Sequence, residues 1–257
     1  MSRFRSAAAV VLAMALAAAA SGCAGPAAGG GAPDKNLTVF AAASLKGPFT
    51  ALAKKFEASH TGTRVTLSFA GSADLATQLS QGAPADVFAS ADQKNMAKVA
   101  GAALVDSTPQ DFASNVLAIA VPPANPANIG TFADLAGPGT KLVVCAPQVP
   151  CGAAAATIAA KAGVALKPVS EESAVTDVLG KVTSGEADAG LVYVTDVRAA
   201  AGKVKGIDFP ESAYAVNKYP IAALKGSRNK ELAAAFVALV TGAEGKQLLT
   251  DAGFGRP

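Results

Sequence analysis

Short apolar segments alternate along this chain with longer segments in which apolar residues recur every three or four positions. The short segments are rich in β-branched residues and predict strands, whereas the longer ones predict amphipathic helices. The predicted strands span 37–42, 64–69, 86–89, 115–122, 141–145, 166–169, 188–193, 205–209 and 214–223. The predicted helices span 45–59, 73–82, 93–100, 131–135, 152–162, 173–184, 194–200, 228–241 and 243–252. This alternation is typical of an α/β protein built on parallel sheet.

Two long extended segments bear on the number of lobes. Residues 115–122 and 213–224 are each long enough to cross from one lobe to another. If they do so, the first lobe is discontinuous in sequence and the second is continuous. A single doubly wound domain fits the same pattern, so the pattern alone leaves both architectures open.

Serine stands twice at the junction between a predicted strand and a predicted helix. Ser44 follows the strand that begins at Leu37, and Ser72 follows the strand at 64–69. A serine at a helix start caps the helix, and the free N–H groups there, with the partial positive charge of the helix end, suit an anion. One such junction would be ordinary capping. Two junctions on successive strand–helix units indicate a shared oxyanion site.

Three further positions fall at the same edge of the predicted sheet. Cys151 and Ser173 lie at the starts of two predicted helices, and Tyr193 ends the strand 188–193. Ligands of open α/β sheets bind at the carboxyl ends of the strands, where these turns occur. Taken singly, each helix start is more often structural, and a lone buried tyrosine is more often a core residue. The case for a site depends on these positions occurring together.

The N-terminus has the pattern of an export signal. Two arginines precede an apolar run at 7–20, which is typical of a signal peptide at 1–22 and is short for a membrane span. Removal of this segment takes two of the 22 Lys and Arg residues, and the rest nearly balance the 19 Asp and Glu residues. A balanced chain without a basic run does not indicate a nucleic-acid partner.

The small residues before Cys23 resemble the bacterial lipoprotein processing box, although the usual leucine is Ala20 here. We therefore expect lipid on Cys23, followed by a flexible linker rich in Gly, Ala and Pro, so that 23–36 forms a tether. The alternative is an ordinary signal cleavage that leaves Cys23 as a free thiol.

If Cys23 carries lipid, Cys145 and Cys151 remain as an even pair in an oxidising compartment, which favours a disulfide between them. A metal site is disfavoured, because two cysteines without a neighbouring histidine are at best half of one.

Catalysis is weakly supported by the residues. His60, the single histidine, follows a predicted helix, and neither a Gly-x-Ser-x-Gly elbow nor a phosphate loop is present in the sequence. Asp86 and Asp92 fit a turn residue and a helix cap, and Ser90 is a lesser candidate for ligand contact. An enzyme is therefore the weaker class.

An ordered set of motifs resembles the molybdate-binding proteins of bacterial ABC transporters. The motifs are Phe40-Ala-Ala-Ala-Ser-Leu45, Phe69-Ala-Gly-Ser72, Gly82-Ala-Pro-Ala-Asp-Val-Phe88 with Ser90-Ala-Asp92, Gly190-Leu-Val-Tyr193, Phe209-Pro-Glu and Tyr219-Pro-Ile. The resemblance extends over essentially all of the chain from Leu37. The ordered set is specific, although any one motif would be weak.

The resemblance implies a two-lobed periplasmic-binding-protein fold of type II, in which each lobe is a sheet flanked by helices and two crossover segments join the lobes. The expected first lobe comprises 37–117 and 216–257, and the second comprises 118–215. The expected protein is a monomer and not an enzyme. We expect it to be exported and lipid-anchored on the outer face of the cytoplasmic membrane, and to deliver molybdate or tungstate to an ABC permease without a cofactor.

The resemblance also implies a ligand site made of neutral donors. The expected hydroxyls belong to Ser44, Ser72 and Tyr193, and the expected main-chain N–H groups to Ser44, Ser72, Cys151 and Val175. The metal would be bound only as its oxyanion, with no direct metal ligands. The family commonly has alanine at the position of Cys151, a difference that leaves a main-chain donor unchanged.

Two other functions stay open at this point. The first is a receptor for sulfate or another tetrahedral oxyanion, which has the same charge and shape. The second is a periplasmic hydrolase that uses Ser44 or Ser72 as a nucleophile. A ferric-ion binder is disfavoured, because such sites usually cluster tyrosines or carboxylates and this chain has only Tyr193, Tyr214 and Tyr219.

Overall fold

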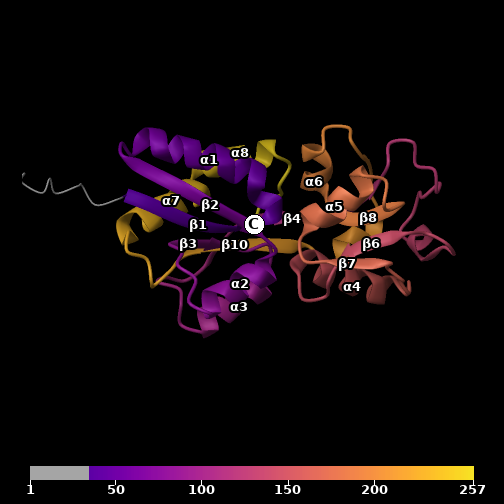
Figure 1. The fold of residues 1–257 in the computed structure, drawn as a ribbon, viewed down its shortest axis with the longest axis horizontal. Coiled ribbons are helices and arrows are strands. Elements are labelled where there is room, and N and C mark those ends of the chain that lie inside the picture. Colours follow the sequence, from indigo (N-terminus) through magenta and orange to yellow (C-terminus); the bar gives the residue numbers. More distant parts are fainter. Residues whose placement is uncertain (1–34) are drawn as a thin grey trace, which may run out of the picture. The chain divides into compact units, whose positions relative to one another are not determined.

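Two five-stranded mixed sheets organise the computed structural model, which describes residues 35–257 (Figure 1). The first sheet has the order β2-β1-β3-β10-β4 and contains β1 (Lys35–Ala42), β2 (Thr63–Ala70), β3 (Val87–Ala89), β4 (Gln110–Asn115) and β10 (Asn217–Ala223). The second has the order β7-β6-β8-β5-β9 and contains β5 (Leu117–Val121), β6 (Leu142–Cys145), β7 (Ser170–Glu172), β8 (Ala189–Tyr193) and β9 (Lys205–Ile207). The predicted two-lobed α/β architecture is confirmed.

The two sheets share one arrangement of strand directions. In the first sheet β1 runs parallel to β2 and β3, and β10 runs antiparallel to β3 and β4. In the second sheet β6 runs parallel to β7 and β8, and β5 runs antiparallel to β8 and β9. Each lobe therefore has one edge at which the carboxyl ends of its parallel strands meet, which is where ligands of such sheets bind.

Helices flank both sheets. The first lobe has α1 (Lys46–Ser59), α2 (Ser72–Ser80), α3 (Gln93–Gly101), α7 (Lys230–Thr241) and α8 (Ala243–Asp251). The second lobe has α4 (Pro150–Ala162), α5 (Val175–Thr183) and α6 (Val194–Ala199). Three short 3-10 helices complete the described chain: η1 (Ala43–Leu45), η2 (Ala133–Ala136) and η3 (Pro210–Tyr214).

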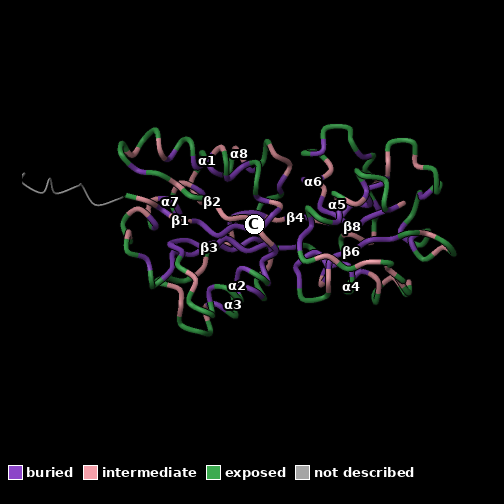
Figure 2. Tube along the Cα trace, in the orientation of Figure 1, coloured by how far each residue is buried: buried purple, intermediate pink, exposed green. Residues whose placement is uncertain are grey.

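The alternation of side chains along the strands creates the cores. Val39 and Ala41 of β1 face the cluster that includes the phenylalanines of α1 and α7, whereas Phe40 faces the opposite cluster with Leu75 and Met96. Residues i and i+2 of a strand share a face, so one strand serves both layers of helices. In Figure 2 the buried residues lie along the central strands of each sheet.

The chain passes between the lobes at a pair of buried asparagines. Asn115 ends β4 and Asn217 begins β10, and the two are paired across the antiparallel ladder. The Nδ2 of Asn115 donates to Oγ1 of Thr195 in α6 at 2.8 Å, so the first lobe also bonds to the second here. Both lobes are thus fixed to the same short segment of paired backbone.

Several predicted boundaries were wrong where the strands are polar. The segment 115–122 is not one strand, because the ladder breaks at Val116 between β4 and β5. β4 begins at Gln110 and is an edge strand. Its polar sequence lacks the apolar pattern from which strands are predicted. The strand expected at 166–169 lies instead at Ser170–Glu172, which is also a polar edge strand.

Other boundaries differ by smaller amounts. The helix expected at 131–135 is the 3-10 helix η2, and β1 begins at Lys35, inside the expected linker. The predicted cap of α3 is confirmed, since Oδ1 of Asp92 accepts the N–H of Asn95 at 2.8 Å.

The predicted signal peptide at 1–22, the lipid site at Cys23 and most of the linker lie outside the described residues. Within residues 35–257 no single helix is long and apolar enough to cross a membrane, and only the bent pair of α7 and α8 reaches that length and composition together.

Candidate functional site

All five of the expected ligand residues line one small cavity between the two lobes. Ser44 and Ser72 come from the first lobe, and Cys151, Val175 and Tyr193 come from the second. The full lining consists of uncharged residues: Ala42, Ala43, Ser44, Gly71, Ser72, Ala91, Val149, Pro150, Cys151, Val175 and Tyr193. The predicted positions are therefore brought together, although they are far apart in the sequence.

Four of these positions lie at the start of a helix. Ser72 and Val175 are the first residues of α2 and α5, Cys151 is the second residue of α4, and Ser44 lies in η1. The N–H groups of a first helical turn have no acceptor inside the helix, and the helix end carries partial positive charge. Helix starts from both lobes therefore place main-chain donors beside the cavity, and no cationic side chain lines it.

The two serines do not cap their helices, which corrects the sequence-based interpretation. The N-cap of α2 is Gly71, and no side chain bonds to the first turn of either α2 or η1. Instead Oγ of Ser72 accepts the N–H of Ala91 at 2.9 Å, and Oγ of Ser44 lies 3.1 Å from Oη of Tyr219. Both hydroxyl groups are held from outside their own helices.

Ser173 does not cap α5 either. The N-cap is Ala174, which makes no side-chain bond, and helical structure begins at Val175 rather than at residue 173. The main chain of Ser173 faces the first lobe instead, at Gly71.

Tyr193 directs an unpaired hydroxyl at this region. The side chain is buried, and its Oη is without a hydrogen-bond partner among the described residues. Burial raises the pKa of this phenol well above its usual value, and the neighbouring Tyr219, Asp196 and Asp92 add to the effect. The phenol therefore stays protonated and is available as a donor. An unpaired buried hydroxyl is costly in a protein interior, so this phenol has a hydrogen-bond donor to offer to a group in the cavity.

Asp196 lies behind Tyr193, in the first turn of α6. Its Oδ2 accepts the N–H of Tyr193 at 2.9 Å, and the side chain is buried. Burial raises the pKa of this carboxyl group to about 7, and the hydrogen bond from Tyr193 opposes the rise. The neutral form of Asp196 is therefore favoured over much of the acidic range, which limits negative charge beside the cavity.

The lobes contact each other directly at the rim of the cavity. A Cβ added at Gly71 would collide with the carbonyl oxygen of Ser173 and would meet Val149, so glycine permits this approach. Nearby, Nδ2 of Asn95 lies 3.5 Å from the carbonyl oxygen of Gln148. The structure therefore shows the two lobes in a closed arrangement.

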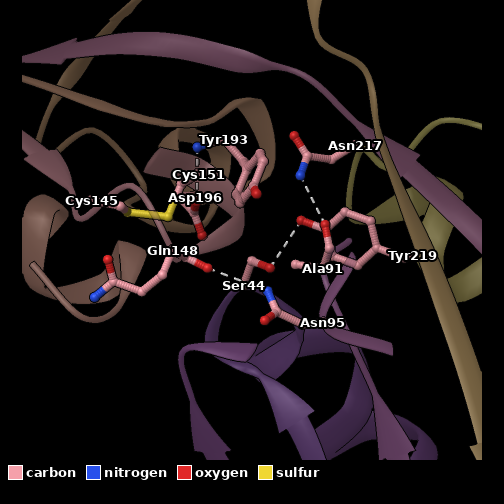
Figure 3. Close-up of a disulfide and its surroundings, with 10 residues drawn as sticks. All are labelled: Ser44, Ala91, Asn95, Cys145, Gln148, Cys151, Tyr193, Asp196, Asn217 and Tyr219. Carbon is pink, nitrogen blue, oxygen red and sulfur yellow. Dashed lines mark hydrogen bonds between the residues drawn. A yellow bond between two sulfur atoms is a disulfide. The ribbon is translucent and has the colours of Figure 1, made fainter. Parts of the chain in front are cut away.

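Cys145 and Cys151 are joined by a disulfide, with their Cα atoms 5.7 Å apart (Figure 3). Both residues are buried, and the bond links the end of β6 to the first turn of α4. The bridge closes the loop that carries Cys151, one of the residues that line the cavity.

The remaining candidates from the sequence have structural contacts. Ser90 is buried but does not line the cavity, and its Oγ accepts the N–H of Asp92 at 3.3 Å. Asp86 accepts from the N–H of Thr38 at 2.7 Å. His60 ends α1 and stacks on Phe56. We therefore assign no ligand contact to these residues.

Six lining residues were not among the expected ligand residues: Ala42, Ala43, Gly71, Ala91, Val149 and Pro150. Gly71 was visible within its motif, but the need for glycine arises only from the second lobe. Ala91 contributes a main-chain group, which no side-chain pattern reveals. Within residues 35–257 there is no cluster of three or more His, Cys, Asp or Glu side chains that would hold a metal ion.

Comparison with known proteins agrees with this geometry. Residues 37–255 match the family described as bacterial extracellular solute-binding protein. The chain is 50% identical over 238 residues to the molybdate-binding protein ModA of Mycobacterium tuberculosis, a match that covers 93% of this chain and 90% of that protein.

Two solved structures show the same fold. The periplasmic molybdate-binding protein of Azotobacter vinelandii has a TM-score of 0.75 at 24% identity, with 86% of this chain and 99% of that chain covered. The sulfate-binding protein SubI of M. tuberculosis has a TM-score of 0.72 at 25% identity, with 86% of each chain covered.

The buried carboxyl group of Asp196 predicts a pH dependence of stability. Its pKa of about 7 in the folded chain exceeds the unfolded value of about 3.9, so the folded chain binds the proton more tightly. The contribution of Asp196 to the free energy of unfolding is complete below the unfolded pKa. It is lost as pH rises toward 7, with a slope of at most about 1.4 kcal/mol per pH unit. Urea unfolding of wild type and Asp196→Asn between pH 4 and 8 measures this, and the variant should lack the decline. Parallel curves for the two proteins would contradict the assignment.

We predict that Cys145 and Cys151 form a disulfide in the exported protein, so that neither has a free thiol. Non-reducing mass spectrometry should find the peptides containing Cys145 and Cys151 linked, and two free thiols there would refute the bond. Replacing both cysteines by serine should lower the free energy of unfolding by about 2 kcal/mol, the chain-entropy estimate for so short a loop. The substitution keeps the main-chain N–H of residue 151, so a change in ligand affinity would report on the stiffness of the loop.

Proposed function

This chain belongs to the family of bacterial extracellular solute-binding proteins, and we propose that it captures molybdate between its two lobes for an ABC transporter. The observation that carries the proposal is the neutral cavity at which four helix starts and three hydroxyl groups converge. The 50% identical relative over 93% of the chain bears the name molybdate-binding protein, which supports the choice of ligand. We extend the proposal to tungstate, which has the same charge and shape.

The chemistry of the donor set fits a dianion that carries no proton. Such an anion only accepts hydrogen bonds, and the proposed ligands only need to donate: hydroxyls of Ser44, Ser72 and Tyr193, with main-chain N–H groups of Ser44, Ser72, Cys151 and Val175. Each hydrogen bond to a charged group contributes about 1.5–3 kcal/mol, so about seven donors offset much of the cost of desolvation. Protonated oxyanions need an acceptor, and such a pocket disfavours them.

Sulfate is the second candidate ligand. It offers the same charge and tetrahedral shape with shorter bonds, so the donor types alone do not exclude it. The chain shares its fold with a sulfate-binding protein, and for this reason sulfate is the alternative ligand that we name. Discrimination between the two anions then depends on the size of the cavity.

A hydrolytic role is disfavoured by family and by geometry. The family is one of solute-binding proteins, so the chain is a binding protein rather than an enzyme. The partners of Ser44 and Ser72 are a phenol and a main-chain N–H, neither of which is the general base that a serine nucleophile requires.

We place the protein outside the cytoplasmic membrane as a monomer, tethered by lipid on Cys23 after removal of 1–22, with an ABC permease as its partner. The proposed first lobe comprises 37–117 and 216–257, and the proposed second lobe comprises 118–215. The two sheets and the pairing of Asn115 with Asn217 support a division near these boundaries, although Leu117 already belongs to β5 of the second sheet.

We further propose that the lobes separate and close by a hinge at the two crossovers. The ligand favours the closed state because both lobes contribute donors to it. The close approach of Gly71 to Ser173 supports a closed state in which these main chains touch.

Calorimetric titration of the ligand-free protein with molybdate, tungstate, sulfate and phosphate tests the function. Molybdate should bind at least about tenfold more tightly than sulfate, which equals 1.4 kcal/mol. Ser44→Ala and Ser72→Ala should each weaken molybdate binding by about tenfold or more, since each removes a donor to a charged ligand. The control Ser80→Ala lies exposed at the other end of α2 and should bind normally.

Stronger binding of sulfate would replace molybdate as the ligand but keep an oxyanion receptor. Unchanged affinity of a Ser44→Ala, Ser72→Ala double variant would show that the cavity is not the binding site.

Gly71→Ala tests closure separately from folding. The main-chain angles of Gly71, φ −60° and ψ 138°, suit alanine, and the atoms that a Cβ would meet all belong to the second lobe. We expect molybdate affinity to fall by more than about tenfold, because the collision opposes closure. Small-angle scattering should show that molybdate compacts the wild type but not the variant.

The matched control is Gly47→Ala in α1, where an added Cβ meets no other atom. Its ligand affinity and its scattering response should equal those of the wild type. A Gly71→Ala protein that binds and compacts normally would contradict the proposed closed contact.

A further inference from the structure

One strand, β10, is linked to both serines of the cavity, to Ser44 directly and to Ser72 through Ala91. Tyr219 is fully buried, and its Oη lies 3.1 Å from Oγ of Ser44 (Figure 3). Asn217 is two residues earlier, and its Nδ2 donates to the carbonyl oxygen of Ala91 at 2.9 Å. The N–H of the same Ala91 donates to Oγ of Ser72 at 2.9 Å. Residues i and i+2 of a strand share a face, so both contacts arise from one face of β10.

The number of hydroxyl hydrogens fixes the direction of these bonds when an anion is bound. A serine has one O–H hydrogen and two lone pairs. If Ser44 donates that hydrogen to the anion, its contact with Tyr219 requires the phenol to donate to the serine oxygen. Ser72 already accepts from Ala91, so its hydrogen is likewise free for the anion. In both cases a donor behind the serine engages a lone pair and leaves the hydrogen for the cavity.

From these contacts we propose that Asn217 and Tyr219 are positioning residues that orient the two serine hydroxyls toward the ligand. Tyr219 acts on Ser44 directly, and Asn217 acts on Ser72 through the main chain of Ala91. The assignment rests on the proposed oxyanion-binding function and adds two residues to it. Neither side chain lines the cavity, so neither is a ligand contact.

The surroundings of Tyr219 suit this role. Its ring packs edge-on against Phe112, Phe254 and Tyr193, with centroids 6.3, 5.4 and 6.0 Å away respectively. Packing on several sides fixes the ring, and a fixed ring fixes the phenol oxygen. Burial raises the pKa of Tyr219, so the phenol keeps the proton that it donates. The Tyr193 ring belongs to the second lobe, so β10 also contacts a donor from the opposite side of the cavity.

A double-mutant cycle separates positioning from a general structural effect. Tyr219→Phe keeps the ring and removes only the hydroxyl. It should weaken molybdate binding about five- to tenfold in the wild type and in the Ser72→Ala background. In the Ser44→Ala background the same substitution should change affinity less than about twofold, because the oxygen that it orients is gone. Tyr214→Phe, at an exposed tyrosine, is the control and should bind as the wild type.

Asn217→Ala supplies the complementary arm. Its effect on affinity should persist in the Ser44→Ala background and disappear in the Ser72→Ala background. Tyr219→Phe and Asn217→Ala should thus lose their effects in opposite serine backgrounds. A general loss of packing on β10 would not produce this difference, since both substitutions are on that strand. Urea midpoints of all variants show which remain folded, and the two arms are judged independently of each other.

The outcomes distinguish the inference from the function on which it rests. If the wild type binds molybdate but Tyr219→Phe has no effect, or has an equal effect in both serine backgrounds, the positioning role is overturned. If the wild type prefers sulfate, the same cycle is run with sulfate and tests the inference unchanged. If the wild type binds no tetrahedral oxyanion, the proposed function and the inference both fail.

Discussion

The unpaired N–H groups of four helix starts are the constraint on which the site depends. Each first turn leaves donors without an internal acceptor, and water satisfies them while the turn is exposed. In the proposed site these donors lie around a small cavity with the Tyr193 hydroxyl, which has no hydrogen-bond partner within residues 35–257. A buried donor without a partner costs about 1–3 kcal/mol. On the proposed function, an empty closed state is therefore unfavourable, and an anion with acceptors on every side would make closure favourable.

The electrostatics of the site follow from the use of main-chain donors in place of cations. Helix ends supply partial positive charge that cannot move away or lose a proton, and they bring no strongly hydrated ammonium group into the cavity. Asp196 is the opposing element, because its carboxylate form would place negative charge behind Tyr193. Burial favours its neutral form, so the folded chain reduces this repulsion. Binding of a dianion should oppose ionisation of Asp196 further, which links ligand affinity to the protonation of a residue outside the cavity.

The sequence predicted which positions come together better than it predicted why they do. The structure places Ser44, Ser72, Cys151, Val175 and Tyr193 around one cavity. They were singled out because strand–helix junctions carry local signals and the ordered motifs resemble a family. The role of the serines as caps was wrong, because the partners of their oxygens, Tyr219 and Ala91, are distant in sequence. The strands β4 and β7 were missed or misplaced since edge strands lack the apolar pattern of central ones. The glycine at 71 shows the same limit, as its necessity comes from the other lobe.

Selectivity for the size of an anion requires that the distance between the two sets of donors be fixed. Hydroxyl and N–H groups accept molybdate and sulfate equally well by chemistry, so only their spacing can discriminate. The first lobe's donors are held by β10, and the second lobe's Cys151 donor sits in a loop closed by a disulfide. The approach of the lobes is limited by main-chain contact at Gly71 and Ser173, which is far stiffer than contact between flexible side chains. Because this limit lies beside Ser72 and Val175, it sets the gap that the anion must span. A smaller anion could not draw the lobes closer to shorten its hydrogen bonds, and it would bind more weakly for that reason.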